Sequence, residues 1–257
     1  MTASSPCPAL PLLHGRSALF LDFDGTLAAI APRPQDVRVE PWVVPTLQFF
    51  LGVLNGAVAV VSGRPLAQLD AYLLPLELPA AGVHGVERRD ACGRLHLEAG
   101  EVPPKVLRAA QRLLASDSRL LLEHKPSALA LHFRGAPELG DLCVHDLLEA
   151  VRPYPLWSAV TGKCVVEVKP RLASKGLAVR AFMAAPTFAG REAVFVGDDT
   201  TDEDGFAAVQ AVGGRGVKVG AGPTAALARL ADPAAVRSWL ELSAASLARP
   251  AFPGLAG

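Results

Sequence analysis

Two carboxylates, Asp22 and Asp24, stand one residue apart at the end of a short apolar run, residues 18–21. In an extended chain, side chains two positions apart leave on the same side, so both carboxylates can converge on one phosphoryl group. Gly25 permits the chain to curl directly after them. One carboxylate could then attack the phosphoryl group while the other transfers the proton. The alternative is an ordinary strand end followed by a turn, where Asp and Gly are favoured for conformational reasons alone.

Two further polar residues stand where a parallel sheet places its functional groups, beyond the carboxyl ends of strands. Ser62 follows the apolar run at residues 57–61, so its hydroxyl and the N–H groups of the next helix could bind an anion. Ser62 could equally be only the N-cap of that helix. Lys175 precedes a helix, which is the unfavourable end for a cation, so it needs an anionic partner unless it is a solvated surface residue.

Five carboxylates occupy residues 198–204, directly after the apolar run at residues 193–196. Such a cluster repels itself without a cation, and Mg²⁺ suits it because this ion prefers hard oxygen ligands. The acids at residues 202–204 could instead lie in the first turn of a helix, where negative charge suits the helix dipole. That explanation does not extend to Asp198, which stands at the strand end. The pattern therefore predicts a Mg²⁺ site that includes Asp198.

The elements that must position these residues alternate between short apolar strands and helices at both ends of the chain. This alternation predicts an α/β fold with a doubly wound, Rossmann-like parallel-sheet core. Buried strands are expected at residues 18–21, 57–61, 193–196 and 217–219, and helices at about residues 44–55, 66–73, 175–185 and 202–209.

The middle of the chain predicts a different kind of structure. Amphipathic helices are expected at residues 102–115 and 137–151, and strands with one polar side at residues 119–124, 128–133 and 163–168. This pattern indicates an inserted α+β cap domain with its own sheet. We place the core at residues 1–95 and 168–257 and the cap at residues 96–167.

Composition and charge exclude several classes of protein. Of the 257 residues, 51% are hydrophobic and 19% are charged, which indicates a compact protein rather than a disordered one. Twenty-five basic residues balance twenty-five acidic ones, so we expect neither nucleic acid nor an anionic membrane as a partner. The four cysteines lack zinc-site spacing and are expected to be free thiols in a reducing cytosol.

The chain shows no sign of export or of a membrane segment. Its first residues lack the basic region and the long apolar core of a signal peptide. Residues 41–63 carry no charge, but Pro45, Gln48 and the turn at Asn55 divide them into a helix and a buried strand. We expect a cytoplasmic protein that is a monomer.

The set formed by Asp22 with Asp24, Ser62, Lys175 and Asp198 matches in type and order the four motifs of the haloacid dehalogenase-like phosphatase superfamily. The chain resembles that superfamily across its whole sheet domain. The resemblance implies that Asp22 is a nucleophile that forms an aspartyl-phosphate. It also implies that Asp24 protonates the departing oxygen and then activates water, while Ser62 and Lys175 bind the phosphoryl oxygens.

The same resemblance implies a bound Mg²⁺ that neutralises the charge of the phosphate. Its ligands would be Asp22, Asp198 and a backbone carbonyl at Asp24. Asp202 and Asp199 would complete the metal shell directly or through water.

Segments of the insertion narrow the resemblance to the trehalose-6-phosphate phosphatase family, which the chain resembles from about residue 17 to residue 239. The segments that carry it are residues 82–87, 123–125, 132–134 and 162–170, together with the acidic run at residues 197–206. The resemblance implies hydrolysis of trehalose 6-phosphate to trehalose and phosphate in a crevice between core and cap.

A disaccharide offers many hydroxyls and no charge beyond its phosphate, so its site needs hydrogen-bond donors and acceptors at fixed positions. Glu123 and Lys125 would face one side of a cap strand, and Lys163 and Glu167 one side of another. The alternative is an exposed sheet face with ordinary cross-strand ion pairs. The further candidate substrate contacts are Gly63, Arg64, His84, Glu87, His132 and Arg134.

Several of these assignments stay open. His84 could be a buried turn histidine, Arg134 could pair with acids of the cap, and Trp157 could line the sugar site or close a cap edge. The substrate could be another sugar phosphate, such as sucrose 6-phosphate or mannosyl-3-phosphoglycerate. A non-catalytic sugar-phosphate sensor is a further alternative, although the intact set of catalytic residues weighs against it.

Overall fold

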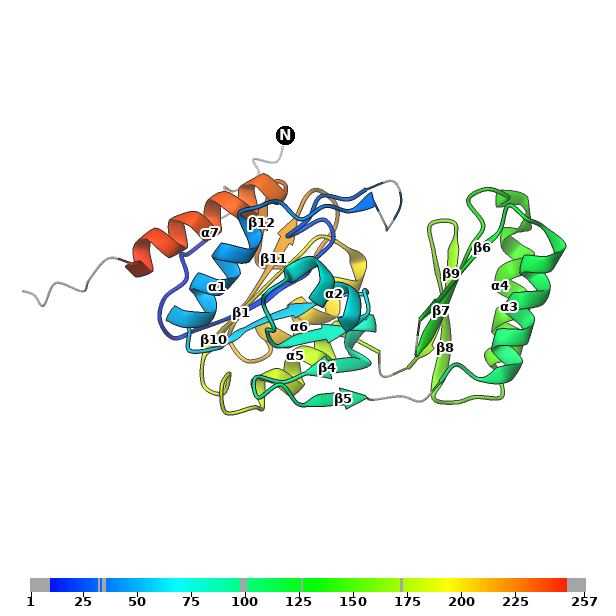
Figure 1. Cartoon of the computed structure of the whole chain (residues 1–257), viewed down its shortest axis with the longest axis horizontal. Coiled ribbons are helices and arrows are strands. Elements are labelled where there is room, and N and C mark those ends of the chain that lie inside the picture. Colours follow the sequence, from blue (N-terminus) through cyan, green and yellow to red (C-terminus); the bar gives the residue numbers. More distant parts are fainter. Residues whose placement is uncertain are drawn as a thin grey trace, which may run out of the picture.

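The computed structural model describes residues 10–31, 33, 36–97, 101–125, 127–171 and 173–248, with Lys125 described by its backbone alone. Figure 1 shows two sheets, each with its own helices, that lie side by side; we call them the core and the cap. The core contains the first and last parts of the chain, and the cap contains the middle part. The predicted α/β fold with an α+β insertion is thereby confirmed.

The core sheet has the strand order β12-β11-β10-β1-β2-β3-β4-β5. The pairs from β12 to β3 are parallel, and β4 and β5 add antiparallel to one edge. The chain begins with β1 at the centre, adds β2 to β5 on one side of it, and later adds β10 to β12 on the other side. This is the doubly wound topology. The strands are β1 (Ser17–Leu21), β2 (Val58–Val61), β3 (Ala80–Gly82), β4 (Glu87–Arg89), β5 (Leu95–Leu97), β10 (Glu192–Gly197), β11 (Arg215–Val219) and β12 (Ala228–Leu230).

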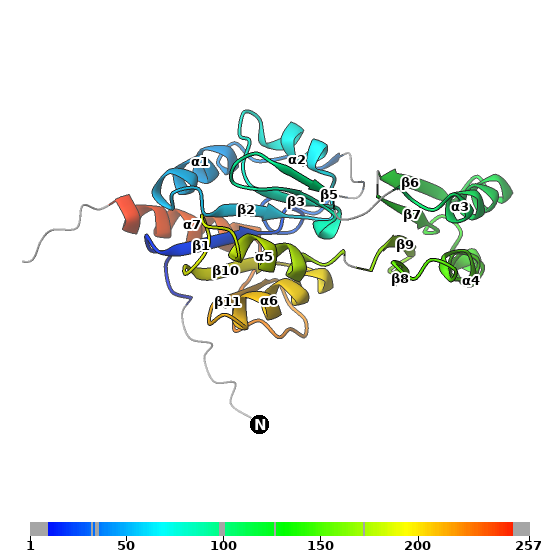
Figure 2. The ribbon, with the colours of Figure 1, turned by 90° about the horizontal axis from the view of Figure 1, so that it is seen from below.

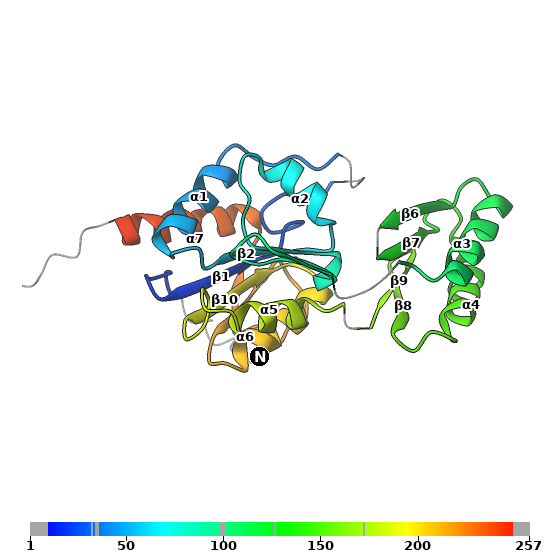
Figure 3. The ribbon, with the colours of Figure 1, turned by 60° about the horizontal axis from the view of Figure 1, so that its bottom comes forward.

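Helices cover both faces of the core sheet. Figures 2 and 3 show α1, α2 and α7 on one face and α5 and α6 on the other. Both sides of β1 are therefore buried, and all five of its residues are excluded from solvent. Among the described helices, none combines the length and apolar character that crossing a bilayer requires. The core helices are α1 (Val43–Val53), α2 (Leu66–Leu73), α5 (Lys175–Met183), α6 (Glu203–Gln210) and α7 (Pro233–Ala248).

The cap is an antiparallel sheet of order β6-β7-β9-β8 with two helices on the face away from the core (Figure 1). Leu129 and Leu131 of β7 are fully buried against these helices. Because strand side chains alternate, Ala130 and His132 face the core instead. The elements are β6 (Leu121–Lys125), β7 (Ala128–His132), β8 (Trp157–Gly162), β9 (Val165–Pro170), α3 (Pro104–Ser116) and α4 (Gly140–Val151).

The predicted boundaries between core and cap fall inside two strands. β5, which ends at Leu97, completes the core sheet, and β9 runs to Pro170. β5 is a short edge strand with Leu95 and Leu97 exposed, so it gives no signal of a buried strand. The end of β9 is defined by the pairing of Pro170 with Trp157, a contact that no local pattern encodes.

Candidate active site

Three carboxylates from separate segments meet at the carboxyl edge of the core sheet. Asp22 follows β1, Asp198 follows β10, and Asp202 ends the short 3₁₀ helix Thr200–Asp202. One oxygen from each lies within 4.8 Å of the others. β1 and β10 are neighbours in register, with Leu21 opposite Val196, so the residues that follow them emerge at the same level. This is the crevice in which doubly wound sheets bind their ligands.

Lys175 lies between two of these carboxylates. Its Nζ donates to Asp22 Oδ1 at 2.7 Å and to Asp202 Oδ1 at 2.6 Å. The residue is only 3% exposed, so it is not a solvated surface lysine. Burial alone would lower the pKa of Lys175, but attraction to Asp22 and Asp202 outweighs burial and raises it. The ammonium therefore stays charged at the first residue of α5.

Lys218 is a second buried ammonium here, and its Nζ donates to the backbone carbonyl of Asp198. The ammoniums of Lys175 and Lys218 together do not balance three carboxylates. Burial raises the pKa of Asp22 well above its ordinary value, and the charges of Asp202 and Asp198 add to this while Lys175 opposes it. Burial also raises the pKa of Asp198 to about 6, with further increases from Asp202 and Asp199. The site thus has the electrostatic character of one that accepts a further cation.

Two glycines allow the acids to approach the backbone this closely. A Cβ at Gly25, which has a φ of +75°, would collide with the Asp198 carboxylate. A Cβ at Gly197 would collide with the Asp202 side chain. A side chain at either position would therefore push the carboxylates apart.

The other acids of residues 198–204 lie apart from this group. Asp199 is exposed, and its N–H donates to Asp202 Oδ2 at 2.9 Å. Asp204 Oδ2 accepts from the Ser174 hydroxyl, and Glu203 Oε2 accepts from the Ala225 N–H. Glu203 and Asp204 lie in the first turn of α6, as the helix-dipole explanation expects. Among the described residues, the carboxylates that cluster are thus those of Asp22, Asp198 and Asp202.

Ser62 follows β2 and is 1% exposed. Its hydroxyl accepts the Arg64 N–H at 3.2 Å. The alternative that Ser62 caps α2 is wrong, because that helix begins at Leu66 and its N-cap is Pro65. Glu87 stabilises the helix start instead: its carboxylate is 7% exposed and accepts the Leu66 N–H at 2.9 Å. The structure therefore places Glu87 behind the site rather than at its surface.

Arg64 and Asp24 form a bidentate ion pair. Arg64 Nε donates to Asp24 Oδ2 and Arg64 Nη2 donates to Asp24 Oδ1, both at 2.7 Å. The guanidinium also lies over the rings of Phe23 and Tyr72, at 5.6 Å and 5.2 Å from their centroids. Sequence reasoning assigned Arg64 to the substrate and did not foresee this pair, because the two residues come from different strand ends.

His84 joins the core to the cap. It lies in a turn where Val83 and His84 both have positive φ, +48° and +56°, a conformation unfavourable for either residue type. The turn holds the imidazole against Gly63, where a Cβ would be only 2.8 Å from the ring. His84 Nε2 also lies 3.6 Å from Glu167 Oε2 on cap strand β9.

The cap sheet turns a charged face toward the core. Glu123 on β6, Ala130 on β7 and Glu167 on β9 form one row across the sheet. His132 Nε2 lies 3.4 Å from Glu123 Oε2, and Lys169 Nζ lies 3.9 Å from Glu167 Oε2. Sequence reasoning did not include Lys169, although its spacing of two from Glu167 puts both on one face. The backbone of Lys125, at the end of β6, pairs with Ala128 of β7, and the Lys125 side chain lies outside the described part.

Two predicted substrate contacts lie away from this face. Lys163 is exposed in the hairpin turn between β8 and β9, and Arg134 is exposed in the turn after β7. The prediction that Lys163 and Glu167 lie on one side of a cap strand is therefore wrong, and Arg134 lies beyond the end of β7. Strand alternation ends where the strand ends, and Cys164 with its φ of +60° already belongs to the turn.

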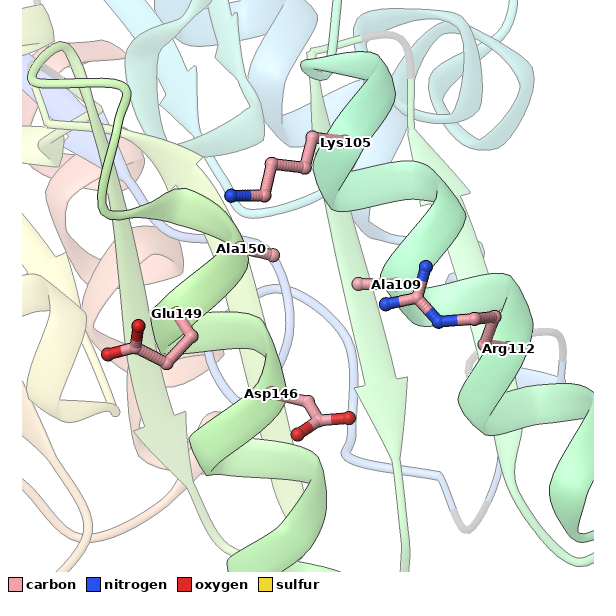
Figure 4. Close-up of a pocket in the computed structure, with 6 residues that line it drawn as sticks. All are labelled: Lys105, Ala109, Arg112, Asp146, Glu149 and Ala150. Carbon is pink, nitrogen blue, oxygen red and sulfur yellow. The ribbon is translucent and has the colours of Figure 1, made fainter.

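A groove of about 210 Å³ lies elsewhere, on the outer side of the cap between α3 and α4 (Figure 4). Basic side chains of α3 and acidic side chains of α4 line it: Lys105, Ala109, Arg112, Asp146, Glu149 and Ala150. None of them belongs to the residues that could do chemistry on a phosphate. The residues that the sequence selects for phosphate chemistry lie instead at the carboxyl edge of the core sheet.

The fold is that of the haloacid dehalogenase-like hydrolases. Solved structures with the same fold include the Candida albicans trehalose-6-phosphate phosphatase C-terminal domain, with a TM-score of 0.76 and 23% identity over 90% of this chain and 92% of that one. A haloacid dehalogenase-like hydrolase from Bacillus subtilis gives a TM-score of 0.63 at 14% identity, covering 87% of this chain and 99% of that one.

Similar sequences identify the family of this chain more narrowly than its fold does. The chain is 42% identical to the Escherichia coli trehalose-6-phosphate phosphatase over 248 residues, 95% of this chain and 92% of that one. It is also 42% identical over 206 residues to a probable trehalose-phosphate phosphatase of Sinorhizobium fredii, covering 79% and 77% of the two chains. The trehalose-phosphatase family profile matches residues 20–233. The protein belongs to the trehalose-phosphatase family and is a phosphoric monoester hydrolase.

Proposed function

We propose that this enzyme hydrolyses trehalose 6-phosphate to trehalose and phosphate, with Mg²⁺ and through an aspartyl-phosphate on Asp22. The observation that carries the proposal is the buried contact of Lys175 with Asp22 and Asp202, with Asp198 in the same cluster. The names of the similar sequences support the choice of substrate.

The carboxylate cluster fits Mg²⁺. One oxygen from each carboxylate lies within 4.8 Å of the others, and carboxylate oxygens are hard donors. Burial, and then repulsion between the acids, raises the pKa values of Asp22 and Asp198, and a bound cation would offset both effects. Asp22, Asp198 and the carbonyl of Asp24 would hold the ion, with Asp202 binding it directly or through water. When bound, Mg²⁺ neutralises phosphate charge so that an anionic nucleophile can approach.

Two displacements at phosphorus account for the reaction. A carboxylate oxygen of Asp22 forms a bond to phosphorus while the bond to the sugar oxygen breaks, and that oxygen takes a proton from Asp24. Trehalose leaves, and Asp22 carries the phosphoryl group. Water then attacks phosphorus and gives its proton to Asp24, and the bond to Asp22 breaks to release phosphate. Lys175 and Ser62 bind phosphoryl oxygens in both steps.

We assign the sugar to the core-facing side of the cap sheet. Glu123, His132, Glu167 and Lys169 supply donors and acceptors there, and the small side chain of Ala130 between them leaves space over the sheet. The cap would also exclude bulk water from the phosphorylated enzyme.

The test is phosphate release by the purified enzyme from a panel of trehalose 6-phosphate, sucrose 6-phosphate and mannosyl-3-phosphoglycerate, with metal removed and Mg²⁺ restored. We expect turnover of trehalose 6-phosphate only with metal, and a loss of about a thousandfold or more in Asp22→Asn. Asp36→Asn, which removes an exposed partner of Arg33, is the matched control and should retain activity. Near-normal phosphate release by Asp22→Asn would contradict the nucleophile assignment. Binding without turnover by the unmodified enzyme would instead indicate a sensor.

A further inference from the structure

The pair of Arg64 with Asp24 has a geometry that a substrate contact does not need. Two parallel hydrogen bonds, each 2.7 Å long, fix both the position and the plane of the Asp24 carboxylate. A single bond would leave the carboxylate free to rotate about its χ2 angle. The bidentate contact therefore specifies one orientation for the Asp24 carboxylate, which transfers protons in the proposed reaction.

The guanidinium that provides this orientation is itself held in place. Its side chain is 9% exposed, whereas that of Asp24 is 37% exposed. Arg64 lies over Phe23 and Tyr72, and its Nη1 donates to Gln68 Oε1 at 3.3 Å. The fixed partner is thus the arginine, and the carboxylate is the partner that remains open to a ligand.

Arg64 also lies within reach of the cap. Burial opposes the charge of Arg64, but its hydrogen bonds to Asp24 and the nearby charges, including Glu123 of cap strand β6, raise its pKa. A carboxylate of the core and a carboxylate of the cap therefore act on the same guanidinium.

We propose that Arg64 is a positioning residue that orients the Asp24 carboxylate for proton transfer to the leaving oxygen and from the attacking water. This inference rests on the proposed function and replaces the assignment of Arg64 to the substrate. A general acid or base must lie within hydrogen-bond reach of the proton it transfers, so a carboxylate free to rotate would be in place only part of the time.

The two steps of the reaction separate this role from others, because p-nitrophenolate leaves without a proton. In Arg64→Ala, the first step on p-nitrophenyl phosphate should stay fast, while the attack of water on the aspartyl-phosphate should slow. Rapid mixing should therefore show a burst of about one equivalent of nitrophenolate, followed by steady turnover about 10 to 100 times slower than that of the unmodified enzyme. With trehalose 6-phosphate, kcat should fall by a similar factor without a burst of trehalose, and KM should change little.

A matched control exists in the same domain. Arg89 forms an equivalent bidentate pair with Asp70, at 2.6 Å and 2.9 Å, and is 9% exposed, but neither residue faces the acidic cluster. Arg89→Ala should lose comparable thermal stability and show no burst. Arg64→Lys keeps the positive charge but cannot form the bidentate contact with Asp24. It should show the same burst with a smaller loss of steady turnover, and it is the test variant if Arg64→Ala does not fold. Added methylguanidinium should restore turnover in Arg64→Ala but not change Arg89→Ala.

The outcomes separate this inference from the proposed function. If KM rises in the Arg64 variants with kcat unchanged, Arg64 binds substrate and the inference is wrong. If both steps on p-nitrophenyl phosphate slow equally and no burst of nitrophenolate forms, the positioning role is also wrong. If the unmodified enzyme forms no phosphorylated aspartate and releases no phosphate from trehalose 6-phosphate, the proposed function itself fails, whatever the variants do.

Discussion

At the scale of single residues, the chemistry depends on charges that the fold forces together. Asp22, Asp198 and Asp202 come from three segments, and Lys175 contacts two of them from a fourth. Burying such groups is unfavourable unless they are paired, and the pairing here is incomplete. The stability of the metal-free enzyme should therefore depend on the protonation of this cluster.

The metal-free enzyme should become less stable as the pH rises from about 4 to about 6. The Asp198 pKa is raised to about 6 from an ordinary value of 3.8, so in this window the folded state binds a proton that the unfolded state has lost. Stability falls with pH wherever the folded state binds more protons, and Asp22, whose pKa is also raised, acts in the same direction. Urea unfolding at several pH values, with and without Mg²⁺, measures this.

At pH 6 and above, Mg²⁺ should restore the stability that the metal-free enzyme has lost, because it replaces the proton as the neutralising cation, and it should bind more weakly below pH 6. Asp198→Asn should flatten the metal-free profile. The prediction is wrong if the stability of the unmodified enzyme depends on pH in the same way with and without metal, or if Asp198→Asn shows the same dependence. Either result would show that this cluster does not control how stability depends on pH.

Much of the residue-level picture could be predicted from the sequence. Asp22, Lys175 and Asp198 each follow a recognisable strand or open a helix, and residue type with position was enough to bring them together. Arg64 and Asp199 were assigned less well. Both are polar residues in the correct loops, and only the tertiary structure decides that the Arg64 side chain turns to Asp24 and that Asp199 stays exposed.

At the scale of elements, the cap sheet is amphipathic across its two faces. Val166 and Val168 of β9 are fully buried on the side of α3 and α4. Glu167 and Lys169, which alternate with them along the strand, face the core. One short strand thus contributes both to the cap's hydrophobic core and to the surface that faces the core. Sequence alternation predicted this for β9 but failed at residue 163, because a hairpin turn is set by pairing with β8.

Glu167→Gln should reduce turnover of trehalose 6-phosphate about 10-fold or more while leaving turnover of p-nitrophenyl phosphate nearly unchanged. The carboxylate lies near His84 and Lys169, and a small aryl phosphate does not extend to the cap sheet. Steady-state kinetics on both substrates measures the ratio. Arg152→Ala, which removes an exposed ion pair with Glu149 on α4, is the control and should affect neither substrate. Equal losses on both substrates in Glu167→Gln would remove the sugar-binding role of this strand.

At the scale of the whole molecule, core and cap have separate hydrophobic interiors joined by a small apolar contact. Val83 and Val86 of the core, Ala128 at the start of β7 and Ala173 after β9 form that contact. The sequence could not predict it, because four small or medium apolar residues at distant positions give no periodic signal.

Ala128→Lys should separate the cap from the core without unfolding either. Ala128 is fully buried, and a charge there cannot remain in an apolar contact without a partner. Small-angle X-ray scattering should show a larger radius of gyration, and turnover of trehalose 6-phosphate should fall about 10-fold or more. Leu148→Lys, at a position of α4 that is already 45% exposed, should leave both quantities unchanged. An unchanged radius in Ala128→Lys would show that this contact does not seat the cap.

The central place of β1 in the core sheet has a consequence for the protein during its synthesis. β1 leaves the ribosome well before its partner β10, which begins about 170 residues later, after the whole cap. Until then, one hydrogen-bonding edge of the apolar strand β1 stays unpaired in the nascent chain. Unpaired strand edges are the places at which strands associate with foreign chains. Molecular chaperones would therefore encounter this core as a half-sheet, and its cluster of carboxylates cannot assemble before β10 and the acids that follow it have been synthesised.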